Sequence, residues 1–114
     1  MIDGINTFMF WSRKTWQAPD EERVVQAASL IHAALGLAGE TGEVVDIIKK
    51  AVYTPQRLQD KGIELVSAVE DELGDVLYYW VRLCDELGLQ PGDIIERVCA
   101  KLEARYGKSE ATGG

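Results

Sequence analysis

Two pairs of acidic residues are the part of this sequence best suited to chemistry. Glu40 and Glu43 lie three positions apart in the first pair, and Glu72 and Asp75 lie three positions apart in the second. Residues at i and i+3 share one face of an α-helix, so each pair can direct two carboxylates toward one point. If the two helices run side by side, four carboxylates converge, and such a concentration of charge is costly unless cations neutralise it. Mg²⁺ and Mn²⁺ prefer oxygen ligands and are the natural candidates.

The residues around each acid indicate that the acids point toward a helix partner. Glu40 and Glu72 fall on apolar stripes of helical period, made by Leu37, Val44 and Ile47 in one segment and by Val69, Val76 and Tyr79 in the other. An acid where an amphipathic helix usually carries Leu or Val breaks the binary pattern, and such breaks are typical of functional sites. The alternative is that these are ordinary solvated carboxylates, since the chain has 19 acidic residues in 114.

Length and composition narrow the class of protein. A chain of 114 residues with 46% hydrophobic content predicts one compact domain with one packed core, over residues 1–106. The net charge of −7 argues against a nucleic-acid partner, which calls for a basic face. The chain carries no leader pattern and no run long enough to span a bilayer, so we expect no membrane association and a cytoplasmic protein.

The histidine and cysteine inventory excludes several kinds of site. His32 is the only histidine, which excludes a catalytic triad and a zinc site built on several histidines. We expect His32 to be structural or to lie on a helix surface. Cys84 and Cys99 fall in apolar helical patterns too far apart for a zinc motif, and we expect both to be buried, reduced thiols.

The elements that must position the acids are all helical. Apolar periodicity predicts an all-α fold of four helices, over residues 5–16, 20–52, about 62–87 and from Pro91-Gly92-Asp93 to about 105. Residues 56–61 are predicted to be a polar linker, Gly88 a C-terminal cap, Asp93 an N-terminal cap, and residues 107–114 a disordered tail.

The predicted packing of these helices rests on two further patterns. The series Val66, Val69, Leu73, Val76, Trp80 and Leu87 predicts a broad buried face on the third helix. Gly36, Gly39 and Gly42 lower the helix propensity of the second, so they indicate either a close approach to the backbone by a helix or a phosphate, or a kink.

The residues that carry the acids resemble a known family. Residues 34–46 (ALGLAGETGEVVD), Lys49-Lys50 and residues 71–79 (DELGDVLYY) are similar to MazG-like nucleotide pyrophosphohydrolases. The similarity continues through residues 101–106 (KLEARY) and covers about residues 8–106. The order, the glycines and the intervening length make this combination specific.

The resemblance implies a four-helix bundle-like domain completed by oligomerisation, with homodimers or homotetramers whose active sites lie near subunit contacts. It implies a nucleoside triphosphate substrate, hydrolysed to the monophosphate and pyrophosphate by metal-activated water at the α-phosphate, with Mg²⁺ as cofactor and Mn²⁺ as a substitute. By the same resemblance the metal ligands and catalytic residues are Glu40, Glu43, Glu72 and Asp75. The residues expected to contact the triphosphate are Lys49, Lys50, Lys101 and Arg105.

Two departures from the family pattern affect the expected site. Gly39 stands where some relatives carry an additional glutamate, and Val98 stands where many carry an asparagine. A dedicated base at the first position is therefore absent, and contacts to the base or sugar are unassigned. Four aromatic residues are able to stack on a base, although core packing is favoured for each: Trp11, Trp16, Tyr79 and Trp80.

Two other classes of protein share parts of this pattern. One is a four-helix metal-binding or storage protein, but ferritin-like bundles use Glu-x-x-His motifs and this chain has none. The other is a helical interaction module whose acids serve only solubility.

Overall fold

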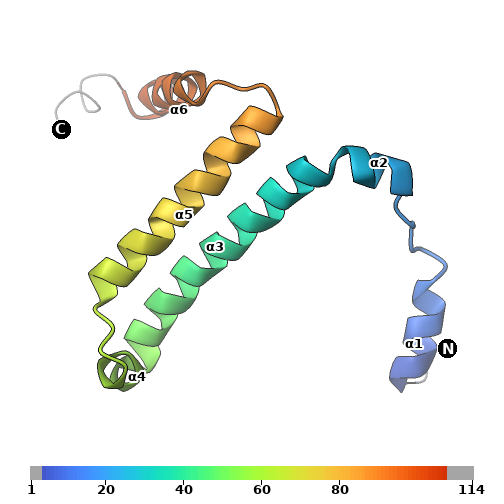
Figure 1. The fold of residues 1–114 in the computed structure, drawn as a ribbon, viewed down its shortest axis with the longest axis horizontal. Coiled ribbons are helices and arrows are strands. Elements are labelled where there is room, and N and C mark those ends of the chain that lie inside the picture. Colours follow the sequence, from blue (N-terminus) through green and yellow to red (C-terminus); the bar gives the residue numbers. More distant parts are fainter. Residues whose placement is uncertain (1–3, 108–114) are drawn as a thin grey trace.

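The computed structural model describes residues 4–107, which form six helices and no strand. The helices are α1 (Gly4–Ser12), α2 (Glu21–Gln26), α3 (Ala28–Tyr53), α4 (Pro55–Asp60), α5 (Leu65–Glu86) and α6 (Pro91–Tyr106) (Figure 1). The predicted all-α fold is confirmed. The tail predicted to be disordered is residues 107–114, and all of it except Gly107 lies outside the described residues.

The centre of the fold is an antiparallel hairpin of α3 and α5, whose ends are joined by α4 (Figure 1). The two apolar stripes face each other along this hairpin, and their members Leu37, Val44, Val69 and Val76 are all half-buried. The short α4 closes one end by burying Leu58. The stripes were therefore read correctly as the contact surface between the two long helices.

The turn from α4 to α5 is well specified, although the prediction of a polar linker over residues 56–61 is wrong. Pro55 occupies the first turn of α4, where its missing N–H is harmless, and the Gln56 Nε2 donates to Asp60 Oδ1 at 2.7 Å. Glu64 then caps α5 by accepting from the backbone N–H groups of Val66 and Ser67 at 3.2 and 2.7 Å. Polar composition alone could not separate this short helix from a loop.

The predicted continuous helix over residues 20–52 is interrupted at Ala27, whose φ of −96° and ψ of 10° separate α2 from α3. Asp20 caps α2, because its Oδ1 accepts from the backbone N–H groups of Glu22 and Arg23. The first helix also ends early, at Ser12 rather than at residue 16.

Gly36 has a clear packing role. A Cβ built on Gly36 would lie 2.7 Å from Tyr79 Cγ and still closer to Cδ1 and Cε1 of the same ring. The absence of a side chain therefore lets the Tyr79 ring of α5 lie directly against the backbone of α3. A Cβ on Gly39 or Gly42 would meet nothing within 4 Å, and α3 runs through all three glycines as one helix, so they mark no break.

The far end of the hairpin leads into α6. Gly88 has a φ of +70° and Leu89 N donates to Cys84 O at 2.8 Å, so the predicted glycine cap of α5 is confirmed. Pro91 begins α6 with Gln90 at the N-cap position, which puts Asp93 in the first turn rather than at the cap.

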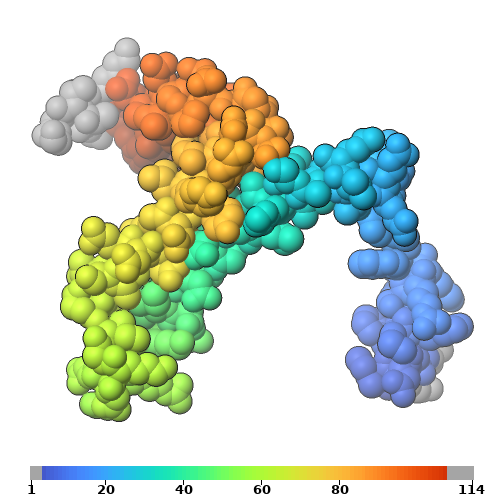
Figure 2. Space-filling view, viewed as in Figure 1, coloured from blue at the N-terminus to red at the C-terminus, as the bar shows by residue number. Residues whose placement is uncertain are grey.

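The single chain is open, so the predicted compact domain does not form within it. Its Cα radius of gyration is 20.9 Å, whereas a compact domain of this length has about 13 Å. Figure 2 shows α1 and α2 projecting as an arm from the end of α3. Among the described residues, only Ala33, Leu58 and Cys84 form a buried apolar core.

Several side chains predicted to be buried are exposed in the single chain. On α5, Val66, Leu73 and Leu87 are at least half exposed, so the expected broad buried face is wrong for one chain. Trp11 and Trp16 are 42% and 76% exposed, which contradicts their assignment to the core. The remaining members of the two sets are half-buried: Val69, Val76, Tyr79 and Trp80. The prediction of burial holds for Cys84 and fails for Cys99.

Candidate metal and substrate site

Three of the four predicted acids meet where α3 faces α5. One carboxylate oxygen from each of Glu40, Glu72 and Asp75 lies within 4.8 Å of the others. We call these three residues the acidic cluster. Glu40 and Glu72 are half-buried because they occupy the facing stripes, whereas Asp75, one turn further along α5, is exposed. The cluster is thus partly covered by the hairpin and open on the Asp75 side.

Glu72 is the most perturbed member of the cluster. Its Oε2 is buried without a hydrogen-bond partner among the described residues. The pKa of Glu72 is raised, and the largest cause is a hydrogen bond to Glu40 that forms only when one of the two carboxyl groups is protonated. Burial and the negative charges of Glu40, Asp75 and Asp71 raise the pKa further.

These features fit a divalent cation. A buried carboxylate oxygen without a donor, placed beside two further carboxylates, is costly when all three are charged. The donor set consists only of hard oxygen atoms, which suits Mg²⁺ or Mn²⁺.

Glu43, the fourth predicted ligand, lies outside the acidic cluster. It is exposed one turn beyond Glu40 on α3. Its side chain instead lines a cavity of about 240 Å³ between α3, α4 and α5, which we call the α4 pocket. The pocket is lined by three cations, two acids and four other residues: Lys50, Arg57, Lys61, Glu43, Asp46, Ile47, Leu58, Ile63 and Ala68.

The two predicted lysines of α3 differ in their surroundings. Lys50 lines the α4 pocket, and its Nζ lies 2.6 Å from Asp46 Oδ2. The hydrogen bond and charge of Lys50 lower the pKa of Asp46. Lys49 makes a longer contact of 3.8 Å with Asp46, is 64% exposed, and does not line the pocket.

Arg57 and Lys61 are residues of the α4 pocket that the sequence interpretation missed. Both belong to residues 56–61, which were predicted to be a linker, so the sequence did not indicate where their side chains lie. Pro55 is the signal that could have revealed them, because proline is common in the first turn of a helix.

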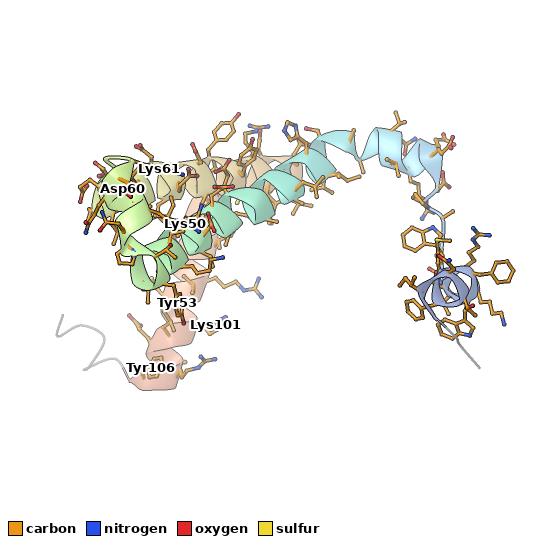
Figure 3. All side chains as sticks on the ribbon, turned by 90° about the horizontal axis from the view of Figure 1, so that it is seen from below. Lys50, Tyr53, Asp60, Lys61, Lys101 and Tyr106 are labelled. Atoms are coloured by element: carbon orange, nitrogen blue, oxygen red, sulfur yellow. The ribbon has the colours of Figure 1, made fainter. Side chains whose placement is uncertain are left out.

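Lys101 and Arg105 are not brought to the acidic cluster within one chain. Both are exposed on α6, which starts at the end of α5 opposite α4 and turns away from the hairpin (Figure 1). Figure 3 likewise shows Lys50 and Lys61 at the α4 end and Lys101 on α6.

A second, smaller cavity lies on the other side of the acidic cluster along the hairpin. It has a volume of about 70 Å³, and its lining includes Ser29, His32, Tyr78, Tyr79, Arg82 and Glu86. The rings of His32 and Tyr78 lie 6.1 and 5.2 Å from the Tyr79 ring, centroid to centroid. His32 is exposed on α3, as expected for a histidine on a helix surface.

The one Lys or Arg side chain among the described residues that line this second cavity, Arg82, is already neutralised. Arg82 pairs with Asp85 at 2.9 Å and with Glu86 at 3.6 Å, and Glu86 also accepts a hydrogen bond from Ser29. The cavity therefore offers aromatic and hydrogen-bonding groups rather than free positive charge.

The fold and the cluster together define an all-α protein whose two facing helices supply a carboxylate set suited to a divalent cation. A family model described as the MazG nucleotide pyrophosphohydrolase domain matches residues 29–109, and the chain belongs to this family. The matched residues span the α3–α5 hairpin and α6, and so include the acidic cluster and the α4 pocket.

The chain is also similar to a curated relative, the "Gene 37 protein" of Mycobacterium phage L5. The two are 30% identical over 88 residues, which is 74% of this chain and 72% of the relative. No solved structure gives a significant match. No helix among the described residues has a stretch both long and apolar enough to cross a membrane.

Proposed function

We propose that this chain is a Mg²⁺-dependent nucleoside triphosphate pyrophosphohydrolase that releases a nucleoside monophosphate and pyrophosphate. The observation that carries this proposal is the convergence of Glu40, Glu72 and Asp75, with a buried and unpartnered oxygen on Glu72. Membership of the MazG family supports the reaction class. The net charge of −7 makes a cation at the cluster more important, because a polyphosphate must approach an acidic protein.

The roles of the acids follow from their positions. Glu40, Glu72 and Asp75 would hold Mg²⁺, or Mn²⁺ in its place. When bound, the cation would lower the pKa of its water and stabilise negative charge on the phosphate oxygens. Glu43 is exposed one turn from the cluster, so it is suited to orient the attacking water or accept its proton. This role would replace the glutamate that some relatives carry where this chain has Gly39.

We also propose that the active form is a homodimer or homotetramer. An open and mainly apolar cavity of about 540 Å³ is lined by five apolar residues and one acid: Ile48, Leu65, Val66, Val69, Leu73 and Glu70. At about 100° per helical residue, Ile48, Val69 and Leu73 lie on the side of the hairpin opposite to Glu43 and Asp75. A second copy covering this apolar face would leave the acidic cluster accessible.

Assembly would also give α6 a function in the site. Lys101 and Arg105 can serve the acidic cluster of another subunit, since α6 turns away from the hairpin of its own chain. Size-exclusion chromatography with light scattering tests this proposal, and a monomer at micromolar concentration would contradict it.

The test of the reaction is a panel of ribo- and deoxynucleoside triphosphates incubated with the purified chain and Mg²⁺, with the products separated by ion exchange. Pyrophosphate and monophosphate are expected from wild type and from the control Glu21→Gln, which removes one exposed acid on α2. Asp75→Asn and Glu43→Gln are expected to lose nearly all turnover with unchanged helical circular dichroism. Intact nucleotides with tight Fe²⁺ uptake would indicate metal storage. If the chain neither hydrolyses nucleotides nor takes up Fe²⁺, it would be an interaction module.

A further inference from the structure

We propose that the α4 pocket binds the terminal phosphates of the substrate, with Arg57 and Lys61 as binding residues beside Lys50. This inference rests on the proposed function and adds to it the part of the protein that grips the phosphate chain. Neither Arg57 nor Lys61 belongs to the acidic motifs or to the set of cations predicted from the sequence.

Arg57 and Lys61 are the cations of the hairpin that lack acidic partners. On α3, Lys49 and Lys50 both pair with Asp46, and on α5 Arg82 pairs with Asp85 and Glu86. Within residues 4–107, Arg57 and Lys61 make no salt bridge within 4.0 Å.

The acids nearest to these two cations in sequence are engaged elsewhere. Asp60 accepts from Gln56, and Glu64 caps the first turn of α5. Of the two acids that line the pocket, Asp46 pairs with Lys50, and Glu43 makes no salt bridge within 4.0 Å among the described residues. Arg57 and Lys61 thus bring two positive charges to the pocket that are available to a ligand.

The α4 pocket starts about one helical turn from the acidic cluster. Glu43 is three residues after Glu40 on α3, and Ala68 is four residues before Glu72 on α5, so both pocket walls adjoin the cluster. Lys50 is ten residues beyond Glu40, about 15 Å along α3. A triphosphate with its α-phosphate at the cluster can thus extend its terminal phosphates toward α4, which leaves the nucleoside toward Tyr79.

The turn after α4 fixes the position of these cations. Gly62 has a φ of +67° and its N–H donates to Gln59 O at 3.0 Å, while Ile63 N donates to Leu58 O at 2.9 Å. This turn holds Lys61 at the end of α4 and buries Leu58. The apolar side chains of Ile47, Leu58 and Ile63 form part of the pocket wall.

The pocket is tested directly by titrating inorganic tripolyphosphate into the protein in the presence of Mg²⁺ and measuring the heat of binding. The proteins to compare are wild type, Arg57→Gln, Lys61→Gln, the double variant and the control Lys14→Gln. Lys14 follows α1 and lies far from the pocket in sequence, and its replacement removes the same single charge. We expect each pocket variant to weaken tripolyphosphate binding by about tenfold or more, since a charge-assisted contact is lost. Binding of a nucleoside monophosphate and the thermal midpoint should stay unchanged in all variants.

A parallel kinetic measurement separates this inference from the proposed function. If nucleoside triphosphates are hydrolysed, the double variant should lower kcat/KM by at least about tenfold while Lys14→Gln has no effect. If no nucleotide is hydrolysed but tripolyphosphate binding still depends on Arg57 and Lys61, the proposed phosphate binding in the α4 pocket is supported and the proposed hydrolysis is refuted. If wild type binds no tripolyphosphate, or the double variant binds it as wild type does, the pocket proposal is overturned.

Discussion

Replacing Gly36 by alanine tests the packing that holds the acidic cluster together. The new Cβ would lie 2.7 Å from Tyr79 Cγ and closer to two other ring atoms, so the ring must move away from α3. Gly39→Ala is a matched control in the same helix, since its Cβ would meet nothing within 4 Å. Both variants gain the helix propensity of alanine, so the difference between them isolates the steric term. Overpacking of this kind costs about 1–3 kcal/mol.

We therefore expect Gly36→Ala to be less stable than Gly39→Ala by about 1–3 kcal/mol in urea denaturation, and its Tm to be lower by at least about 4 °C. Both proteins must be compared at one concentration, because assembly changes apparent stability. Tyr79 is one turn from Asp75, so Gly36→Ala should also weaken Mn²⁺ binding. Equal stability of the two variants, or a more stable Gly36→Ala, would refute the packing of Tyr79 on α3.

Three further predictions concern titration and thiol exposure. Because the pKa of Glu72 is raised in the folded state, protonation of Glu72 stabilises the metal-free folded protein fully below pH 4.5, and this stabilisation is lost as the pH rises through the raised pKa. Glu72→Gln should flatten that loss in denaturation profiles measured with chelator, and an unchanged profile contradicts this. Lys50 lowers the pKa of Asp46, so the ion pair stabilises the folded protein above pH 3.8, and this stabilisation is lost as the pH falls through the lower folded-state pKa. Asp46→Asn should remove this loss of stability at low pH, and a variant that keeps the loss would disprove the pairing. Cys99 should react rapidly with a thiol reagent in the native protein and Cys84 only after denaturation; two rapidly reacting thiols per chain would contradict the burial of Cys84.

The part of the fold that the sequence predicted well is local in origin. The stripes around Glu40 and Glu72 report a period of 3.6 residues, and that period alone identifies which faces of α3 and α5 meet. Gly88 was predicted because a left-handed residue after a helix strongly favours glycine. The three acids of the cluster followed from the same two faces.

The parts that were missed depend on information that a local pattern does not hold. Nothing in the composition around Ala27 marks a break, since alanine is a strong helix former. Apolar residues such as Leu73 indicate burial but not whether the covering surface belongs to the same chain, so one compact core was expected where the chain is open. For the same reason the position of Lys101 relative to the cluster could not be derived from its place in α6.

A Mn²⁺ titration followed by electron paramagnetic resonance shows whether the acidic cluster binds a divalent cation. The proteins to compare are wild type, Asp75→Asn and the control Glu21→Gln. Asp75 is exposed, so its replacement removes one proposed ligand with little effect on folding. We expect equal Mn²⁺ affinity for wild type and Glu21→Gln, and an affinity at least about tenfold weaker for Asp75→Asn. Equal binding by wild type and Asp75→Asn at unchanged helicity, or no binding by wild type even with nucleotide present, would contradict the proposed cation site.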